Sequence, residues 1–265
     1  MGDIEGSATP TRSGIRPSST GVWQLTADIN VARQLAAAGF DWLALDAQHG
    51  AFDRSDLVAV GRALEDVGAN FVVRVPGVDP VWVGLALDAG ASAVIVPTVG
   101  SIHDAEAMVT AAHYPPLGQR SWGPFNAMWG GDAPDPQTAN QRIQCILMIE
   151  TRAALEDVDA IAAVDGVDAL FIGPFDLSLS LGITIDALLS DPGDDAPIPT
   201  IVRAAERHGR TVVAFAGEPA RVPAFRAFGI DALAVTTDIG LLELGARSAI
   251  DLVRGDRRSG ENPNR

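Results

Sequence analysis

Five ionisable residues follow short apolar runs in this sequence, and together they could carry acid–base and metal chemistry. Asp46 and His49 come after one run, and Arg74 ends the next. Glu150 and Asp176 follow two later runs. Continuous apolar runs are typical of buried parallel strands, and the carboxyl ends of such strands meet at one face of the fold, where active sites lie. We therefore expect one site that contains all five residues.

The two later acids, Glu150 and Asp176, are the predicted metal ligands. Two carboxylates that leave several positions open suit Mg²⁺, Mn²⁺ or a similar divalent ion such as Co²⁺, which keeps water ligands and accepts a chelating substrate. Zinc would require clustered His or Cys residues, and the sequence has four histidines and one cysteine that are not clustered. Each acid also has a structural alternative. Glu150 could be an N-cap or first-turn acid of the helix that follows, and Asp176 could be the cap of a short helix at 177–181.

The absence of lysine narrows the chemistry further. All 19 basic residues are arginines, and arginine stays protonated, so no side chain can form a Schiff base with a carbonyl substrate. If the protein makes or breaks carbon–carbon bonds next to a carbonyl, a metal ion is the expected replacement for the amine.

The remaining candidates would bind an anion or move a proton. Arg74 ends an apolar strand, where a guanidinium needs an anionic partner. That partner is either a substrate oxygen or a carboxylate, Asp46 or Asp88. His49 lies three residues after Asp46, which could orient the imidazole as a general base.

Two further features could bind a carboxylate group. The backbone N–H groups of residues 173–176 resemble those of a helix N-terminus, which bind anions. Arg120 is a second candidate anion ligand, and anchoring a loop is an equally good interpretation of it.

Composition limits the class of protein. The 265 residues are 47% hydrophobic and carry a formal charge of −15, which suits one large α/β domain and argues against nucleic acid or an anionic membrane as partner. One cysteine excludes an intrachain disulfide, and no apolar stretch reaches transmembrane length. We expect a cytoplasmic protein whose ends, residues 1–19 and 255–265, are mobile tails around a barrel of residues 20–254.

The fold class follows from a repeated pattern in which a helical segment ends at glycine and a short apolar run begins. Glycine suits the left-handed residue just past a helix. Eight strands are expected, at 22–25, 39–46, 70–75, 90–97, 143–149, 166–173, 211–216 and 229–236. Helices are expected at 29–38, 54–67, 81–89, 102–112, 152–164, 198–208, 220–228 and 239–253. Strict alternation predicts a (β/α)₈ barrel. An open doubly wound sheet is the alternative, but its glycine-rich fingerprint after the first strand is missing.

Several strings of this sequence resemble the HpcH/HpaI family of metal-dependent pyruvate aldolases. They are FDWLALDAQHG from Phe40, VR at Val73, LDAGA from Leu87, YPPLGQR from Tyr114, IETR from Ile149 and FIGPFDLS from Phe171. The resemblance covers residues 21–254. It implies a (β/α)₈ barrel, usually a hexamer (a trimer is the alternative), in which the last helix is exchanged between subunits.

The resemblance also implies an activity, the reversible cleavage of 4-hydroxy-2-oxo acids to pyruvate or hydroxypyruvate and an aldehyde through an enolate on the divalent metal. Oxaloacetate decarboxylation by the same site is an alternative. A phosphate-binding barrel isomerase is a more remote one, because acids at Glu218 and Asp238 stand where a phosphate cup would be.

Residue by residue, the resemblance implies metal ligands at Glu150 and Asp176, a pyruvate-binding Arg74 and an acid–base pair of His49 with Asp46. It also implies substrate-binding positions, which are Gly173, Pro174 and Phe175 at the pyruvate carboxylate, and Gln48, Asp88 and Arg120. Asp88 matches a position that reaches a neighbouring subunit's site. Three departures put acceptor specificity in question: Gln48 replaces a frequent Glu, Met148 replaces a frequent Gln, and Asn126 stands where related loops often carry Arg.

Overall fold

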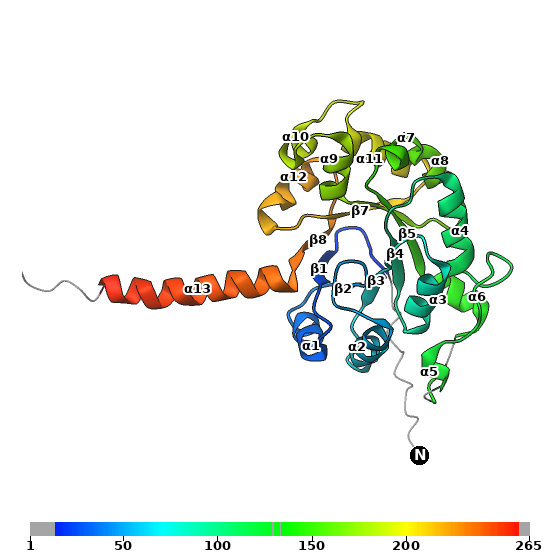
Figure 1. Ribbon diagram of the computed structural model, residues 1–265, viewed down its shortest axis with the longest axis horizontal. Coiled ribbons are helices and arrows are strands. Elements are labelled where there is room, and N and C mark those ends of the chain that lie inside the picture. Colours follow the sequence, from blue (N-terminus) through cyan, green and yellow to red (C-terminus); the bar gives the residue numbers. More distant parts are fainter. Residues whose placement is uncertain (1–13, 129, 133, 260–265) are drawn as a thin grey trace, which may run out of the picture.

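In the computed structural model, eight parallel strands close into a barrel in the order in which they occur in the chain (Figure 1). The structure describes residues 14–128, 130–132 and 134–259. The strands are β1 Thr20–Gln24, β2 Trp42–Asp46, β3 Phe71–Arg74, β4 Ala93–Val96, β5 Gln144–Ile149, β6 Ala169–Ile172, β7 Thr211–Phe215 and β8 Ala232–Thr237. The predicted (β/α)₈ fold is therefore confirmed.

Helices surround the barrel between successive strands. They are α1 Ile29–Ala37, α2 Arg54–Asp66, α3 Pro80–Asp88, α4 Ile102–Ala112, α5 Phe125–Met128, α6 Pro136–Arg142, α7 Arg152–Glu156, α8 Val158–Ala163, α9 Pro174–Leu181, α10 Ile185–Ser190, α11 Pro197–Arg207, the 3₁₀ turn η1 Pro219–Arg221, α12 Val222–Ala227 and α13 Asp238–Ser259. Asp53 and Asp79 cap α2 and α3, because their side chains accept hydrogen bonds from N–H groups of the first helical turn. The helix predicted at 152–164 is two helices, α7 and α8, which meet at Asp157.

The alternation of side chains along each strand decides which residues enter the barrel. Ala44, Val72 and Met148 belong to the buried cluster inside the barrel, whereas their neighbours, such as Leu45 and Val73, pack outward against the helices. The residues two positions further along β2, β3 and β5 therefore also face inward. Because of this alternation, the ionisable residues at the strand ends point into the mouth of the barrel and not toward the helices.

The opposite end of the barrel is closed by residues of the expected N-terminal tail. Ile15 is buried, its N–H donates to Gln144 Oε1 over 2.7 Å, and Gln144 Nε2 donates back to the Ile15 carbonyl. Ser19 Oγ accepts a hydrogen bond from Trp42 Nε1. The expected boundary at residue 19 is therefore wrong for residues 14–19, because an apolar side chain fills the bottom of the barrel. Residues 1–13 and 260–265, the rest of the expected tails, lie outside the described residues.

The last helix, α13, extends away from the barrel (Figure 1). It continues to Ser259, so the expected end of the folded chain at residue 254 falls inside a helix. Its first residue, Asp238, is buried and accepts hydrogen bonds from the N–H groups of Leu25 and Thr26. In the part of the chain that the structure describes, no helix combines the length and the apolar character needed to cross a bilayer.

Candidate active site

The centre of the barrel mouth is an ion pair between neighbouring strands. The register of β2 and β3 places Asp46 directly opposite Arg74. Arg74 Nε donates to Asp46 Oδ1 over 2.9 Å and Nη2 donates to Oδ2 over 2.5 Å, and both residues are buried. Two parallel hydrogen bonds fix the plane of the guanidinium as well as its position. Of the partners expected for Arg74, the structure therefore selects Asp46 and not Asp88.

The electrostatics of this pair keep Asp46 charged. Burial by itself would raise the pKa of the Asp46 carboxyl, but the hydrogen bonds and charge of Arg74 outweigh it, so the pKa lies below its ordinary value. The Arg74 guanidinium also lies over the Trp23 ring, 5.0 Å from its centroid. The guanidinium is therefore held between a charged carboxylate and the Trp23 ring.

Glu150 follows β5 and has one carboxylate oxygen without a partner. Its Oε1 accepts a 2.6 Å hydrogen bond from the Thr98 N–H, whereas Oε2 is buried and has no hydrogen-bond partner among the described residues. Thr98 has a φ of 56°, which is strained for a β-branched residue and is typical of functional sites. Burial raises the pKa of Glu150, and the nearby charge of Asp176 raises it further.

Asp176 lies in the first turn of α9, whose N-cap is Gly173 and whose first residue is Pro174. The helix is longer than the 177–181 turn that would place Asp176 at the cap, so Asp176 does not cap it. A buried carboxylate oxygen without a donor, next to a second carboxylate, is destabilised unless a cation joins it. The two residues therefore fit a divalent ion with open positions.

No cluster of three or more His, Cys, Asp or Glu residues that could hold a metal exists within the described ranges. The site consequently fits an ion that takes water or substrate oxygens for its remaining ligands, and not a structural zinc.

His49 lies at the mouth, but Asp46 does not orient its ring as predicted. Asp46 Oδ1 accepts hydrogen bonds from the backbone N–H groups of Gln48, over 3.0 Å, and His49, over 3.2 Å. The prediction of a side-chain pair was wrong because the carboxylate is already engaged by Arg74 and by this turn. The imidazole is exposed, lines the cavity described next, and is close enough to lower the pKa of Glu150 through its charge.

A cavity of about 220 Å³ opens among these residues. Its polar lining consists of Asp46, His49, Arg74, Asp176 and Thr237. Its apolar lining includes Trp23, Leu25, Met148, Phe171, Pro174, Phe175 and Phe215. Glu150 lies immediately behind Gly173, another lining residue, because a Cβ on that glycine would be 2.7 Å from Glu150 Oε2.

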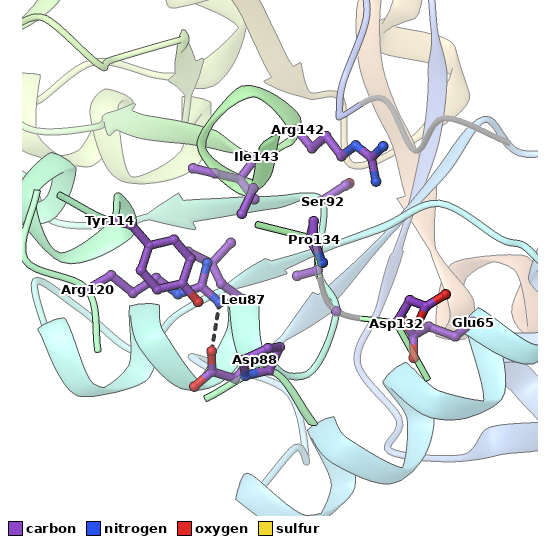
Figure 2. Close-up of a pocket in the computed structure, with 14 residues that line it drawn as sticks. Glu65, Leu87, Asp88, Ser92, Tyr114, Arg120, Asp132, Pro134, Arg142 and Ile143 are labelled. Atoms are coloured by element: carbon purple, nitrogen blue, oxygen red, sulfur yellow. Dashed lines mark hydrogen bonds and ion pairs between the residues drawn. The ribbon is translucent and has the colours of Figure 1, made fainter. Parts of the chain in front are cut away.

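Two of the predicted substrate residues do not reach this cavity in the single chain. Arg120 Nη2 donates to Asp88 Oδ1 over 2.7 Å, and the Arg120 guanidinium lies over Tyr114 (Figure 2). These residues line a second cavity beside Ser92 and Ile143, which precede β4 and β5, so it lies at the end of the barrel opposite the mouth. Burial raises the pKa of Asp88, although Arg120 opposes the shift. Within one chain, Arg120 therefore anchors a loop.

The other predicted residues lie at or next to the mouth. Gly173, Pro174 and Phe175 line the cavity, and Met148 does so from β5. Gln48 has a buried Oε1 that lacks a hydrogen-bond partner in the described part of the protein.

Three residues that matter here were missed by the sequence analysis, namely Trp23, Thr98 and Phe215. Trp23 and Phe215 lie within predicted strands, and Thr98 directly follows one. The rule that found the ionisable residues would have indicated them too if uncharged residues near strand ends had been considered.

Comparison with known proteins places this geometry in a family. The family described as HpcH/HpaI aldolase/citrate lyase matches residues 19–242. The chain is similar to 4-hydroxy-2-oxovalerate aldolase of Novosphingobium aromaticivorans, with 40% identity over 67% of this chain and 70% of the relative. It is also similar to 2-dehydro-3,6-dideoxy-6-sulfogluconate aldolase of Pseudomonas putida, with 35% identity over 89% and 92%. A crystal structure of a family member from Burkholderia cenocepacia J2315 is 32% identical and superposes with a TM-score of 0.81 over 92% of this chain and 97% of that one.

Proposed function

The chain belongs to the HpcH/HpaI aldolase/citrate lyase family, and we propose that it is a divalent-metal-dependent aldolase acting on 4-hydroxy-2-oxo acids. The protein is a carbon–carbon lyase, as its curated relatives are. The proposed products are an aldehyde and pyruvate or hydroxypyruvate. The observation that carries the proposal is the unpartnered, buried Glu150 Oε2 beside Asp176, next to the cavity that Arg74 lines.

Glu150 and Asp176 would hold the ion, which when bound supplies a Lewis acid for the 2-oxo acid. In the cleavage direction a base removes the proton of the C4 hydroxyl, the C3–C4 bond breaks, and its electron pair becomes the enolate of pyruvate while the aldehyde leaves. Proton return to C3 completes pyruvate. His49 is the residue that we assign to the proton transfer, because its imidazole is exposed at the cavity.

Arg74 stabilises the negative charge that develops on the 2-oxo acid. Asp46 fixes the guanidinium on one edge, so no reorganisation is needed when charge appears. The backbone of Gly173–Phe175 lines the same cavity at the start of α9 and is assigned to the substrate carboxylate.

Chelation tests the proposal directly. Treatment with EDTA should abolish cleavage of 4-hydroxy-2-oxopentanoate, and Mg²⁺, Mn²⁺ or Co²⁺ should restore it. Glu150→Gln and Asp176→Asn should each lose Mn²⁺ binding measured by calorimetry, while Glu106→Gln, an exposed acid of α4, should bind as the unaltered protein does. Activity that is indifferent to chelation would refute the metal role. A parallel assay with oxaloacetate compares decarboxylation with aldol cleavage by kcat/KM.

We also propose that the protein acts as a homo-oligomer through α13. Six large apolar side chains of this helix are at least 48% exposed, namely Ile239, Leu242, Leu244, Ile250, Leu252 and Val253. Exposed apolar area of this kind marks an interface. A trimer or a hexamer with exchanged helices would cover it, and the Asp88–Arg120 pair would then lie beside a neighbouring copy's mouth. The cytoplasmic location expected from the sequence stays a prediction that fractionation of the source cells can check.

A further inference from the structure

The cavity at the mouth has two chemically different sides. The charged side holds Asp46, Arg74 and Asp176, all of which the proposed reaction uses. The other side is aromatic. Trp23 lies where the two sides meet, under the Arg74 guanidinium, with ring centroids 5.5 Å from Phe171 and 5.3 Å from Phe215, and Phe215 is 6.1 Å from Phe175. We call Trp23, Phe175 and Phe215 the aromatic wall.

The aromatic wall is held in place from behind. Phe175 is 41% exposed, and its ring contacts Phe215 and the Arg221 guanidinium, which is 5.6 Å from the ring centroid. Arg221 is fixed in turn by an ion pair with Glu218, 2.9 Å long. Gly217, with φ +77°, passes so close that a Cβ there would lie 3.0 Å from the Phe175 ring. These contacts preorganise the wall before any substrate arrives.

Few polar groups remain for the second substrate. Among the described residues that line the cavity, only Thr237 and His49 are polar and not assigned to the metal, Arg74 or its partner. Met148 occupies the position on β5 two residues before Glu150 with a thioether, which is only a weak acceptor. A hydroxyl or carboxylate group of an acceptor aldehyde that packs against the aromatic wall would lose its hydrogen bonds to water without gaining a protein partner.

We propose that the aromatic wall selects the acceptor, so that the enzyme uses a small, uncharged, apolar aldehyde in preference to a hydroxylated or anionic one. The inference rests on the proposed aldolase function and names its second substrate class. The cavity volume of about 220 Å³ must hold the 2-oxo acid and the acceptor together, which limits the acceptor to a short or planar apolar group.

Propanal and glycolaldehyde form a matched pair for the test, because they differ by a methyl group in place of a hydroxyl. In the synthetic direction, C3 of pyruvate loses a proton and bonds to the aldehyde carbon, and the carbonyl oxygen takes up a proton. The products are 4-hydroxy-2-oxohexanoate and 4,5-dihydroxy-2-oxopentanoate. We expect the unaltered enzyme to have a kcat/KM for propanal at least about tenfold that for glycolaldehyde, because an unpaired hydroxyl is costly to bury.

The two aldehydes also differ in intrinsic reactivity. This difference cancels when the propanal-to-glycolaldehyde ratio of kcat/KM in a variant of the wall is compared with the same ratio in the unaltered enzyme. Phe215→Asn puts an amide in the wall and should lower the propanal-to-glycolaldehyde ratio by about tenfold. Phe215→Leu keeps the wall apolar and should change the ratio by less than about threefold. If the Phe215 variants do not fold, the same two substitutions at the more exposed Phe175 give the comparison. A ratio that does not change in the Asn variants, or a wild-type preference for glycolaldehyde, overturns the inference.

Exchange of the C3 protons of pyruvate in D₂O, with Mn²⁺ removed by EDTA before the spectrum is taken, separates this inference from the proposed function. If the C3 protons of pyruvate exchange but the enzyme shows no preference for propanal, the aldolase function stands and the selection of the acceptor by the aromatic wall is refuted. No exchange and no product with either aldehyde refutes the function itself.

Discussion

Replacement of Gly173 by alanine should weaken metal binding although Gly173 is not a ligand. A Cβ at this position would lie 2.7 Å from Glu150 Oε2 and 2.9 Å from both Glu150 Cβ and Met148 Cε. The backbone φ of −91° is open to alanine, so the effect comes from the clash and not from backbone strain. Glu150 Oε2, the atom that we propose faces the metal, must therefore move.

The size of the effect follows from the overlap. Ordinary contact begins at 3.4 Å, so Oε2 must shift by about 0.7 Å or the start of α9 must move by as much. Changes to groups that position a metal ligand typically cost about 10- to 100-fold in affinity, which corresponds to about 1.4–2.8 kcal/mol. We expect a loss of Mn²⁺ affinity in this range and a loss of turnover that excess Mn²⁺ restores only in part, because the ligand stays displaced.

Calorimetric titration with Mn²⁺ measures the first effect, and steady-state cleavage of 4-hydroxy-2-oxopentanoate at increasing Mn²⁺ measures the second. Gly84→Ala in α3 is the matched control, since a Cβ there meets nothing within 4 Å; it should keep the Mn²⁺ affinity and stabilise the helix by about 0.5–1 kcal/mol. Thermal unfolding verifies that both variants fold. If Gly173→Ala binds Mn²⁺ as tightly as the unaltered protein, the placement of Glu150 Oε2 as a metal-facing atom is refuted.

Three further predictions concern the ion pair and the last helix. Arg74→Met should lower kcat/KM by about 10²-fold or more and the free energy of urea unfolding by about 3–5 kcal/mol, because it leaves the Asp46 carboxylate buried and unpaired; unfolding equal to that of the unaltered protein would contradict this. The pKa of Asp46 is lowered in the folded state, so its pairing stabilises the fold above the unfolded pKa, about 3.9, and this stabilisation is lost as the pH falls through the folded pKa. The stability difference between the unaltered protein and Asp46→Asn should consequently be largest near pH 7 and shrink below about pH 4, and a difference that is independent of pH would be inconsistent with the pair. Leu242→Glu on the exposed apolar face of α13 should reduce the assembly size in light scattering, whereas Arg247→Glu, on the polar side that also carries Glu243, should not. Equal masses for all three proteins would remove α13 from the interface.

The barrel could be predicted from the sequence because its determinants are local. Six of the eight strands, namely β2, β3, β4, β6, β7 and β8, are short apolar runs that closely follow a glycine at the end of a helix. Strict alternation of helices and strands leaves few topologies. The element boundaries were less predictable. The sequence pattern merged α7 and α8, and it treated residues 14–19 as a tail because a single apolar residue, Ile15, gives no periodic signal.

The strand ends also predicted most of the ionisable residues that meet at the mouth of the barrel. Asp46 and Arg74 end their strands, and Glu150 follows one. Each lies two residues after a side chain that faces into the barrel, so it faces inward too. Their convergence therefore followed from the fold class. The chemistry that we propose for them, an anion-binding arginine and hard oxygen donors in a chain without lysine, needed only the residue types.

Only the tertiary structure decided which of these groups are partners. Asp46 is three residues from His49 but 28 residues from Arg74, yet the register of β2 against β3 gives its carboxylate to the arginine. Asp88 and Arg120 pair at the opposite end of the barrel, and Trp23, Phe175 and Phe215, from three separate elements, form the aromatic wall. Sequence patterns report the direction of a side chain from its own strand or helix, whereas a partner is chosen by the registers and packing of separate elements, which no local pattern contains.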